Sequence, residues 1–351
     1  MKILHLIYSF NTGGSETMLV DIANEQVKQA EVSIVVINRI YNETLLNKID
    51  KRVKVYLINR TESSKNPFSA LKLNIILMIL NAEVLHCHNH NIIPILLPWL
   101  RGKSVLTLHC LGIPSKYLGK YHQLFAISES VRKDVISRTN INSTVVYNGI
   151  STNAIVTKQD YSVKNYFRIV CVGRLEHNLK GQHLVLEALH LLNEKGFSNI
   201  RLDLIGSGSS DEYLKEMTTI YELTEQVSFL GLKDRDYIYV HLKDYDLLVQ
   251  PSLFEGFGLT VAEGMAAKVP VLVSNVEGPM EIIGKGKYGF HFEAGNAKKL
   301  AESIQHISKY NSDLLKMGAN EAFLHVIENF DIKSTASKYL QNYLIINELY
   351  S

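Results

Sequence analysis

Short apolar runs alternate with longer amphipathic stretches along the whole chain. The short runs are rich in Val and Ile, which is typical of buried strands, and the stretches between them have the spacing of helices, for example over residues 17–29 and 67–80. The strand-like runs are KILHLIY, VSIVVIN, VKVYLIN, EVLHCH, SVLTLH, LFAIS and TVVYN in the first half, then FRIVCVG, IRLDLIG, VSFLG, YDLLVQ, VPVLVS and FHFE. This alternation predicts βαβ units and parallel sheets.

The polar stretch 151–165 interrupts the alternation and has no period of its own. A chain of 351 residues also exceeds the size at which single hydrophobic cores stop growing. We therefore expect two doubly wound α/β domains, residues 1–150 and 166–331, joined by a linker over 151–165.

Composition narrows the class of protein. Hydrophobic residues make up 46% of the chain and charged residues 21%, which excludes a disordered protein. The three cysteines, Cys87, Cys110 and Cys171, are scattered and odd in number, so no disulfide framework is expected. Neither a bilayer-spanning segment nor a signal peptide is evident. These features together predict a cytoplasmic protein.

The net charge of +2 conceals an asymmetry. Residues 1–150 carry 17 Lys and Arg against 10 Asp and Glu, a net +7, and the rest of the chain carries −5. Such a split predicts a surface that meets an anionic partner, although ordinary solvation explains it as well. No motif for binding nucleic acid is present.

Ligands of doubly wound sheets bind beyond the carboxyl ends of the strands, so the residues that follow each strand matter most. Gly13 and Gly14 follow the first strand and precede a helix, whose free N–H groups suit an anion. The spaced three-glycine fingerprint is absent, so binding of NAD is not expected. His109 closes the strand SVLTLH at the same edge.

Three histidines surround the end of the strand EVLHCH. His86, His88 and His90 share one face if the extended geometry persists, whereas Cys87 points into the interior. Three such histidines resemble a metal site, but no supporting carboxylate is near. We expect no metal here and a ligand-lining role for His88.

In the second half, cations and glycines follow the strands. Arg174 and Lys180 lie between a strand and the helix predicted from Gln182, where two cations and a helix N-terminus suit a diphosphate. Gly206 and Gly208 follow the next strand and would let a base or ribose approach the backbone closely.

The stretch PSLFEGFGLTVAEGMA carries the most chemistry. Glu255 lies in its glycine-rich loop and Glu263 lies in the following helix. An acidic residue among apolar groups and glycines is costly without a partner, so each carboxylate is expected to accept hydrogen bonds from ligand hydroxyls. Gly258 permits close approach, and the N–H groups of residues 257–260 are free at the helix start.

The motifs of this chain, taken together and in their order along the sequence, resemble those of the retaining glycosyltransferases of family 4. These enzymes have two facing Rossmann-like, doubly wound domains (the GT-B architecture). The resemblance covers nearly the whole chain. The motifs are GGSE, the histidine-bearing strand ends, AISESVRKDV, YNG, VGRL with the downstream Lys-Gly, LIGSGS, VSFLG and the Glu-x7-Glu stretch.

The resemblance assigns a role to each candidate residue. Arg174 and Lys180 would bind the donor diphosphate, Glu255 the transferred sugar and Glu263 the ribose, while His109 would face the reacting sugar. The other implied donor contacts are Gly13, Gly14, Gly206, Phe257, Gly258 and Leu259. The final segment, residues 332–351, would pack as a helix on the first domain.

The implied reaction transfers a sugar from a nucleotide-sugar to a glycan or lipid-linked acceptor in surface polysaccharide assembly. The expected donor is a UDP-sugar, with GDP-sugars as the second choice. The anomeric configuration is retained without a metal or other cofactor, and a donor phosphate oxygen takes the acceptor proton. Asp234-Arg235-Asp236 spells the metal-binding triplet of another glycosyltransferase architecture, but here it precedes a helix and is expected to be an ordinary helix start. A nucleotide-sugar 2-epimerase and a non-catalytic sugar-binding subunit remain alternatives.

The positive first half predicts contact with an anionic membrane, on the inner face of the cell membrane. The apolar run 92–100 would insert, with Arg101 and Lys103 following it and Lys116 and Lys120 flanking Tyr117. The alternative for residues 92–100 is a core helix interrupted by prolines.

Overall fold

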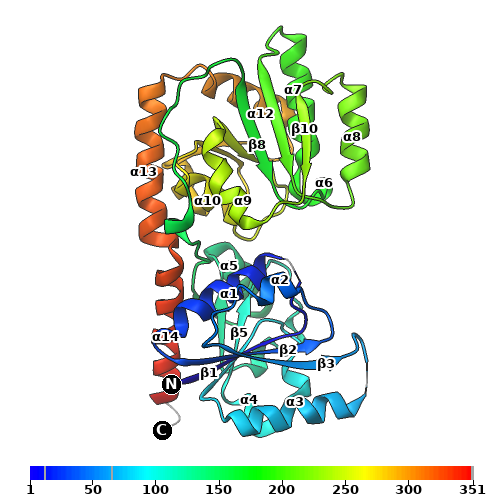
Figure 1. Cartoon of the computed structure of the whole chain (residues 1–351), viewed down its shortest axis with the longest axis vertical. Coiled ribbons are helices and arrows are strands. Elements are labelled where there is room, and N and C mark those ends of the chain that lie inside the picture. Colours follow the sequence, from blue (N-terminus) through cyan, green and yellow to red (C-terminus); the bar gives the residue numbers. More distant parts are fainter. Residues whose placement is uncertain (12, 65, 349–351) are drawn as a thin grey trace. The chain divides into compact units, whose positions relative to one another are not determined.

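The computed structural model describes residues 1–11, 13–64 and 66–348, and divides them into two compact units (Figure 1). Unit 1 contains Met1–Ile150 and the chain from Phe330 onward, and unit 2 contains Ser151–Asn329. Because the end of the chain returns to unit 1, unit 2 is an insertion between two segments of unit 1.

Unit 1 is built on a seven-stranded sheet of order β3-β2-β1-β4-β5-β6-β7, in which all pairs are parallel. Its strands are β1 Lys2–Ile7, β2 Glu31–Asn38, β3 Lys54–Arg60, β4 Val84–Cys87, β5 Ser104–Leu108, β6 Gln123–Ala126 and β7 Thr144–Val145. Its helices are α1 Gly14–Gln26, α2 Glu43–Leu46, α3 Pro67–Leu80, α4 Pro98–Arg101, α5 Glu129–Thr139 and α14 Ile332–Glu348. The strand order reverses between β1 and β4, which makes that edge the expected ligand site of the unit.

Unit 2 repeats the same topology with a six-stranded parallel sheet of order β10-β9-β8-β11-β12-β13. Its strands are β8 Phe167–Val172, β9 Ile200–Ile205, β10 Val227–Gly231, β11 Leu247–Gln250, β12 Val271–Ser274 and β13 Phe290–Phe292. Its helices are α6 His177–Lys180, α7 Gln182–Glu194, α8 Asp211–Ile220, α9 Arg235–His241, α10 Leu259–Ala266, α11 Glu277–Ile282, α12 Ala297–Ile307 and α13 Ser312–Phe330. Here the order reverses between β8 and β11. The predicted strands and the parallel doubly wound class are therefore confirmed.

Helix α14 packs against α1 and the sheet of unit 1 and is held there by buried tyrosines. The hydroxyl of Tyr339 lies 3.0 Å from Thr107 Oγ1, and that of Tyr343 lies 2.5 Å from His86 Nδ1. Where α14 begins, Ile150 and Asp331 form a parallel bridge. The bond from Ile150 N to the Phe330 carbonyl measures 2.8 Å. The two chain segments that leave unit 1 are thus paired with each other.

Residues 151–165 form no strand or α-helix, but they pack closely on unit 2. The amino group of Lys158 bonds Asp246 at 3.0 Å, and the ring of Tyr161 joins the core of unit 2. The predicted linker is therefore an ordered border of unit 2.

Two expectations concern apolar segments. Ile92, Ile93 and Leu96 are buried, whereas Pro94, Pro98 and Trp99 are exposed, so the run 92–100 cannot insert into a membrane as a whole. In the described part of the chain, no helix combines the length and the apolarity needed to cross a bilayer.

Candidate active site

The candidate residues of unit 2 gather where the carboxyl ends of β8 and β11 meet. Glu255 follows β11, and Lys180 is the last residue of the short helix α6, which sequence reasoning missed. The Lys180 Nζ lies 2.5 Å from Glu255 Oε2, and both side chains are partly buried. The structure therefore joins, in one ion pair, two residues that were predicted to bind different parts of the donor.

Further hydrogen bonds fix one oxygen of Glu255. The Gln250 Nε2 donates to Glu255 Oε2 at 2.9 Å, and Gln250 is itself held by the hydroxyl of Thr260 at 2.5 Å. In the described residues, all hydrogen bonds to this carboxylate reach Oε2. Oε1 is thus left to accept hydrogen bonds from a ligand.

Arg174 is the most solvent-accessible candidate of unit 2. Its side chain is 71% exposed, and its Nη1 lies 3.7 Å from Glu176 Oε2, a loose surface pair. Such a pair contributes little to stability, so the guanidinium is available to a phosphate.

The start of α10 has the geometry that was expected of it. Gly258 adopts φ +108°, a conformation that favours glycine, and Leu259 opens the helix. The side chains of Phe257 and Glu263 are both buried. Phe257 can therefore offer only backbone groups to a ligand.

Packing within unit 2 already requires glycine at positions 206 and 208. A Cβ on Gly206 would overlap the Gly173 carbonyl, and a Cβ on Gly208 would overlap the backbone of Leu175. The loops after β8 and β9 therefore approach each other closely at adjacent strand ends. The predicted contact of these glycines with a base or ribose stays a prediction.

In unit 1, Gly13 and Gly14 lie where α1 begins. Gly13 precedes the helix with φ −151°, an extended conformation open to any residue, and Gly14 is its first residue. The hydroxyl of Thr17 donates to the Gly13 carbonyl at 2.7 Å, and that of Ser15 donates to Glu16 Oε2 at 2.7 Å. Glu16 therefore places a carboxylate at the N-terminus where an anion was expected.

A chain of imidazoles crosses the β1–β4–β5 edge of unit 1. His88 Nδ1 lies 3.0 Å from His109 Nε2, and His88 Nε2 lies 3.1 Å from His5 Nδ1. His5 Nε2 in turn lies 2.8 Å from Gln26 Oε1 of α1. The structure thus connects His88 and His109 to each other and to two residues that sequence reasoning missed.

Burial keeps these histidines neutral. Desolvation lowers the pKa of His5 and of His109 to about 4, and it lowers the pKa values of His86 and His88 well below their usual range. Cys87 lies buried, as predicted, and burial raises the pKa of its thiol.

The expected trio of His86, His88 and His90 is wrong in one member. Strand β4 ends at Cys87, so the extended geometry does not persist as far as His90. Its place is taken by His5, which lies opposite His86 in the parallel register of β1 and β4. Each of these three buried histidines offers a nitrogen within 4.8 Å of the others.

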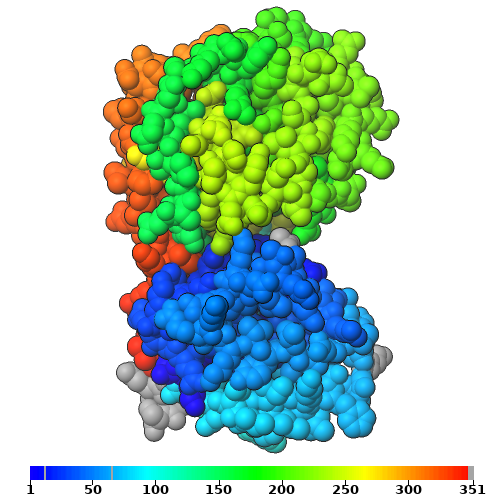
Figure 2. Space-filling model, viewed as in Figure 1, coloured from blue at the N-terminus to red at the C-terminus, as the bar shows by residue number. Residues whose placement is uncertain are grey.

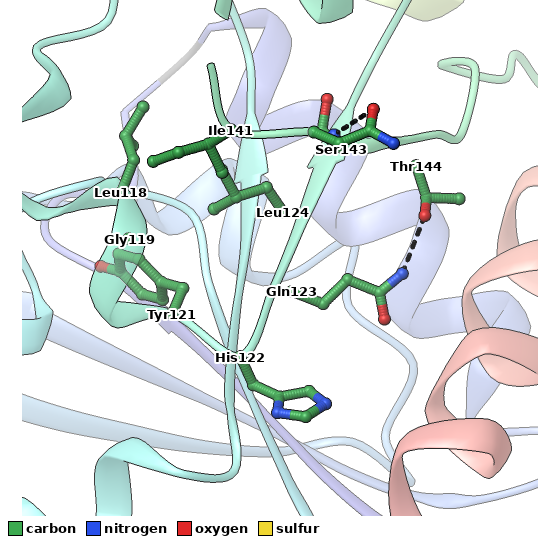
Figure 3. Close-up of a pocket in the computed structure, with 10 residues that line it drawn as sticks. Leu118, Gly119, Tyr121, His122, Gln123, Leu124, Ile141, Ser143 and Thr144 are labelled. Atoms are coloured by element: carbon green, nitrogen blue, oxygen red, sulfur yellow. Dashed lines mark hydrogen bonds between the residues drawn. The ribbon is translucent and has the colours of Figure 1, made fainter. Parts of the chain in front are cut away.

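Two other features lie away from the strand ends that carry the candidates. A pocket of about 250 Å³ lies at the amino end of β6, and its lining includes His122, Gln123 and Ser143 (Figure 3). It therefore opens at the wrong edge of the sheet for the expected ligand. Asp234 caps α9 by accepting a bond from the Tyr237 N–H at 2.8 Å, which confirms its interpretation as a helix start.

Each half of the chain matches a family of glycosyltransferases. A family described as Glycosyltransferase Family 4 matches residues 12–154, and one described as Glycosyl transferases group 1 matches residues 156–322. The first match contains strands β2 to β7 of unit 1, and the second contains all six strands of the sheet of unit 2.

Individual relatives agree with these families. An uncharacterized glycosyltransferase of Methanocaldococcus jannaschii is 28% identical over 301 residues, 76% of this chain and 76% of its own. The capsular polysaccharide biosynthesis glycosyltransferase CapM of Staphylococcus aureus is 27% identical over 52% of this chain and 51% of its own. The crystal structure of Anabaena Alr3699/HepE in complex with UDP-glucose superposes with a TM-score of 0.81 over 97% of this chain and 99% of that chain. At 22% identity, this last likeness shows the fold alone.

Proposed function

We propose a specific transfer reaction for this chain, which is a glycosyltransferase of the GT-B type: it moves a hexose from a UDP-sugar to a glycan or lipid-linked acceptor, with retention of anomeric configuration. The donor binds unit 2 and the acceptor binds unit 1. No metal or other cofactor takes part.

The observation that carries the proposal is the arrangement around Glu255. Lys180 and Gln250 hold Oε2, which leaves Oε1 directed to sugar hydroxyls without a cost in reorganisation. Lys180 supplies a positive charge at the same place, and the exposed Arg174 supplies a second. Two cations beside a sugar-binding carboxylate suit a nucleotide-sugar, whose diphosphate is the leaving group.

The leaving group also suggests how retention is achieved. As the sugar–oxygen bond breaks, negative charge grows on the diphosphate, and Arg174 and Lys180 stabilise it. A phosphate oxygen on the departing face takes the proton of the acceptor hydroxyl, which then attacks from that same face. The product keeps the configuration of the donor, and no side chain need act as base.

The finer choices rest on similarity. The structural neighbour HepE is found with UDP-glucose, which supports UDP as the nucleotide. The similarity to CapM supports a role in surface polysaccharide assembly. Calorimetry against UDP, GDP and ADP tests the first point, and tighter binding of GDP than of UDP contradicts it.

A turnover assay separates the proposal from its alternatives. UDP release from a panel of UDP-sugars is measured with and without a lipid-linked acceptor pool, in the presence of EDTA. We expect acceptor-dependent UDP release that EDTA leaves unchanged, and a product with the anomeric coupling of the donor. Conversion of the UDP-sugar to its C2 epimer would indicate the epimerase instead, and binding without any turnover would indicate a sugar-binding subunit.

We also propose that unit 1 binds an anionic membrane surface, and that helix α3 provides the apolar part of the contact. Phe68, Leu71, Ile75, Met78 and Ile79 lie at helical spacing and are all exposed, Phe68 by 73% and Ile79 by 75%. A helix that is apolar on its outward face needs a covering, and a contiguous apolar surface of this kind marks an interaction site.

Helix α4 extends this surface. Asn74 of α3 bonds the backbone of Ile95 and Leu97 at 2.8 and 2.9 Å, so the two segments are neighbours (Figures 1 and 2, light blue to cyan). Trp99 of α4 is 65% exposed. Lys72 and Arg101 are the charged residues of the two helices, and neither helix contains an acidic residue. Apolar and aromatic groups beside cations suit an anionic lipid surface.

Membrane binding by α3 and α4 can be tested by fluorescence, because Trp99 is the only tryptophan of the chain. Vesicles of anionic lipid should shift its emission to the blue, more weakly at high salt, and vesicles of neutral lipid should not. Replacement of Ile75 and Ile79 by Ser should abolish the shift. The matched control replaces Ile220, a residue of unit 2 that is 67% exposed, and should leave it intact. Equal shifts with both kinds of vesicle would contradict the electrostatic contribution.

A further inference from the structure

The imidazole chain in unit 1 has a definite direction. The carbonyl oxygen of Gln26 can only accept, so His5 Nε2 must carry its proton and His5 Nδ1 must accept. His88 then donates from Nε2 to His5 and accepts at Nδ1. His109 therefore donates from Nε2 to His88. A neutral His109 in this chain keeps an unprotonated Nδ1.

The far end of the chain is open to a ligand. His109 is partly exposed, whereas Gln26, His5 and His88 are buried. The described residues provide no hydrogen bond to His109 Nδ1. A lone pair is thus presented at the carboxyl end of β5, beside the β1–β4 switch point, where ligands of this fold bind.

We propose that Gln26, His5 and His88 are positioning residues that hold His109 in its Nε2–H form, so that Nδ1 accepts a hydrogen bond from a substrate hydroxyl. The inference rests on the proposed function, which places the acceptor on unit 1, the unit that contains His109. It adds three residues, from β1, α1 and the end of β4, whose effect reaches the substrate only through His109.

The chain is suited to fixing a tautomer and not to moving protons. A proton that entered at His109 could pass through His88 to His5, but it would then stop at the amide oxygen of Gln26, which is a poor base. The same bonds also disfavour a metal ion. His5 and His88 use all four ring nitrogens in the chain, and both nitrogens of the neighbouring His86 are bonded to Thr107 and Tyr343.

Nuclear magnetic resonance of the whole protein labelled with ¹⁵N-histidine reads the tautomers directly. We expect His109, His88 and His5 each to show a protonated Nε2 and an unprotonated Nδ1 at neutral pH. A protonated Nδ1 on His109, or a mixture of the two forms, would overturn the proposal. Zinc found at these rings in the purified protein would overturn it as well.

Variants of Gln26 test the positioning effect without touching His109. Gln26→Leu removes the acceptor that directs the chain, so we expect a mixed His109 tautomer and a kcat lower by about five-fold, the scale of one hydrogen bond, with the KM for the donor unchanged. Gln26→Glu keeps an acceptor oxygen opposite His5 Nε2 and should restore the single His109 tautomer. Asn24→Leu is the matched control. Asn24 lies on the same helix, but it bonds the backbone of Lys48 and Asp50 and no member of the imidazole chain.

The outcomes separate this inference from the proposed function. A mixed tautomer with an unchanged kcat in Gln26→Leu overturns the positioning role. An unchanged tautomer in that variant overturns the role of Gln26. Absence of turnover by the unmodified protein with every donor contradicts the proposed function instead, and the resonance assignments of His109 are measured independently of it.

Discussion

Glu255 is the residue whose replacement distinguishes sugar binding from nucleotide binding. Its Oε1 is free for hydroxyls while Oε2 is held by Lys180. We expect Glu255→Ala to abolish sugar transfer and to leave the affinity for UDP nearly intact, because UDP lacks the sugar that Glu255 is proposed to bind. Turnover assays and calorimetry measure the two effects, and normal turnover would show that the site is assigned wrongly.

Arg174 should behave differently from Glu255. Because its exposed guanidinium has only a loose pair to Glu176, it is available to stabilise the diphosphate leaving group. Arg174→Ala should lower turnover by about 10²-fold, as expected for loss of charge stabilisation at a developing anion. Arg168→Ala offers a control, since Arg168 is exposed near the amino end of β8, whereas Arg174 follows the carboxyl end of that strand. Similar losses in both variants would argue against a direct role.

The sequence reveals residues of this kind only when glycine or a strand end marks them. Glu255 and Lys180 were found because each sits in or beside a glycine-bearing loop after a strand. Nothing local marks His5, which lies inside β1 among apolar neighbours, or Gln26, which is the last residue of α1. Their contact depends on the parallel register of β1 with β4 and on the packing of α1, which no single segment encodes.

At the scale of elements, the loops after β8 and β9 depend on each other. Gly208 lies against the backbone of Leu175, and Leu175 N donates to Ser207 O at 3.1 Å. Gly208→Ala should therefore force the loops apart and destabilise unit 2 by about 1–3 kcal/mol, the usual cost of overpacking. Denaturant unfolding measures it. Gly318→Ala is a useful comparison in the same unit: a Cβ there meets no atom within 4 Å, and its backbone lacks the positive φ that favours glycine.

Periodicity predicted the long elements well and the short ones poorly. Helix α3 occupies the expected residues 67–80, because Asn66 caps it and Pro67 opens it. The four-residue α6 was missed, since one turn has no recognisable period. Residues 92–100 illustrate a further limit: composition alone could not show that Ile92 and Ile93 face the core while Trp99 faces solvent.

At the scale of the whole molecule, acid should destabilise unit 1 first. Its buried histidines have pKa values lowered by desolvation, to about 4 for His5, whereas the unfolded chain takes up protons below about pH 6.5. Their contribution to stability is complete above pH 6.5 and is lost as the pH falls toward 4, by about 1.4 kcal/mol per pH unit for a fully buried histidine such as His5. Hydrogen exchange at pH 7.5 and 5.5 should therefore show a larger loss of protection in β1 and β4 than in β8 and β11. Equal losses would mean that these histidines do not control acid stability.

The return of α14 to unit 1 has a consequence for how the protein is made. A ribosome releases β1 to β7 first, but the helix that covers His86 and Phe125 is made only after the whole of unit 2. Unit 2 is complete in sequence before then. Contrary to the usual order, in which the amino-terminal domain folds first during synthesis, the inserted unit can reach its native state while unit 1 still lacks α14. A released chain truncated before Ile332 should thus contain a protease-resistant unit 2 and a protease-sensitive amino-terminal half.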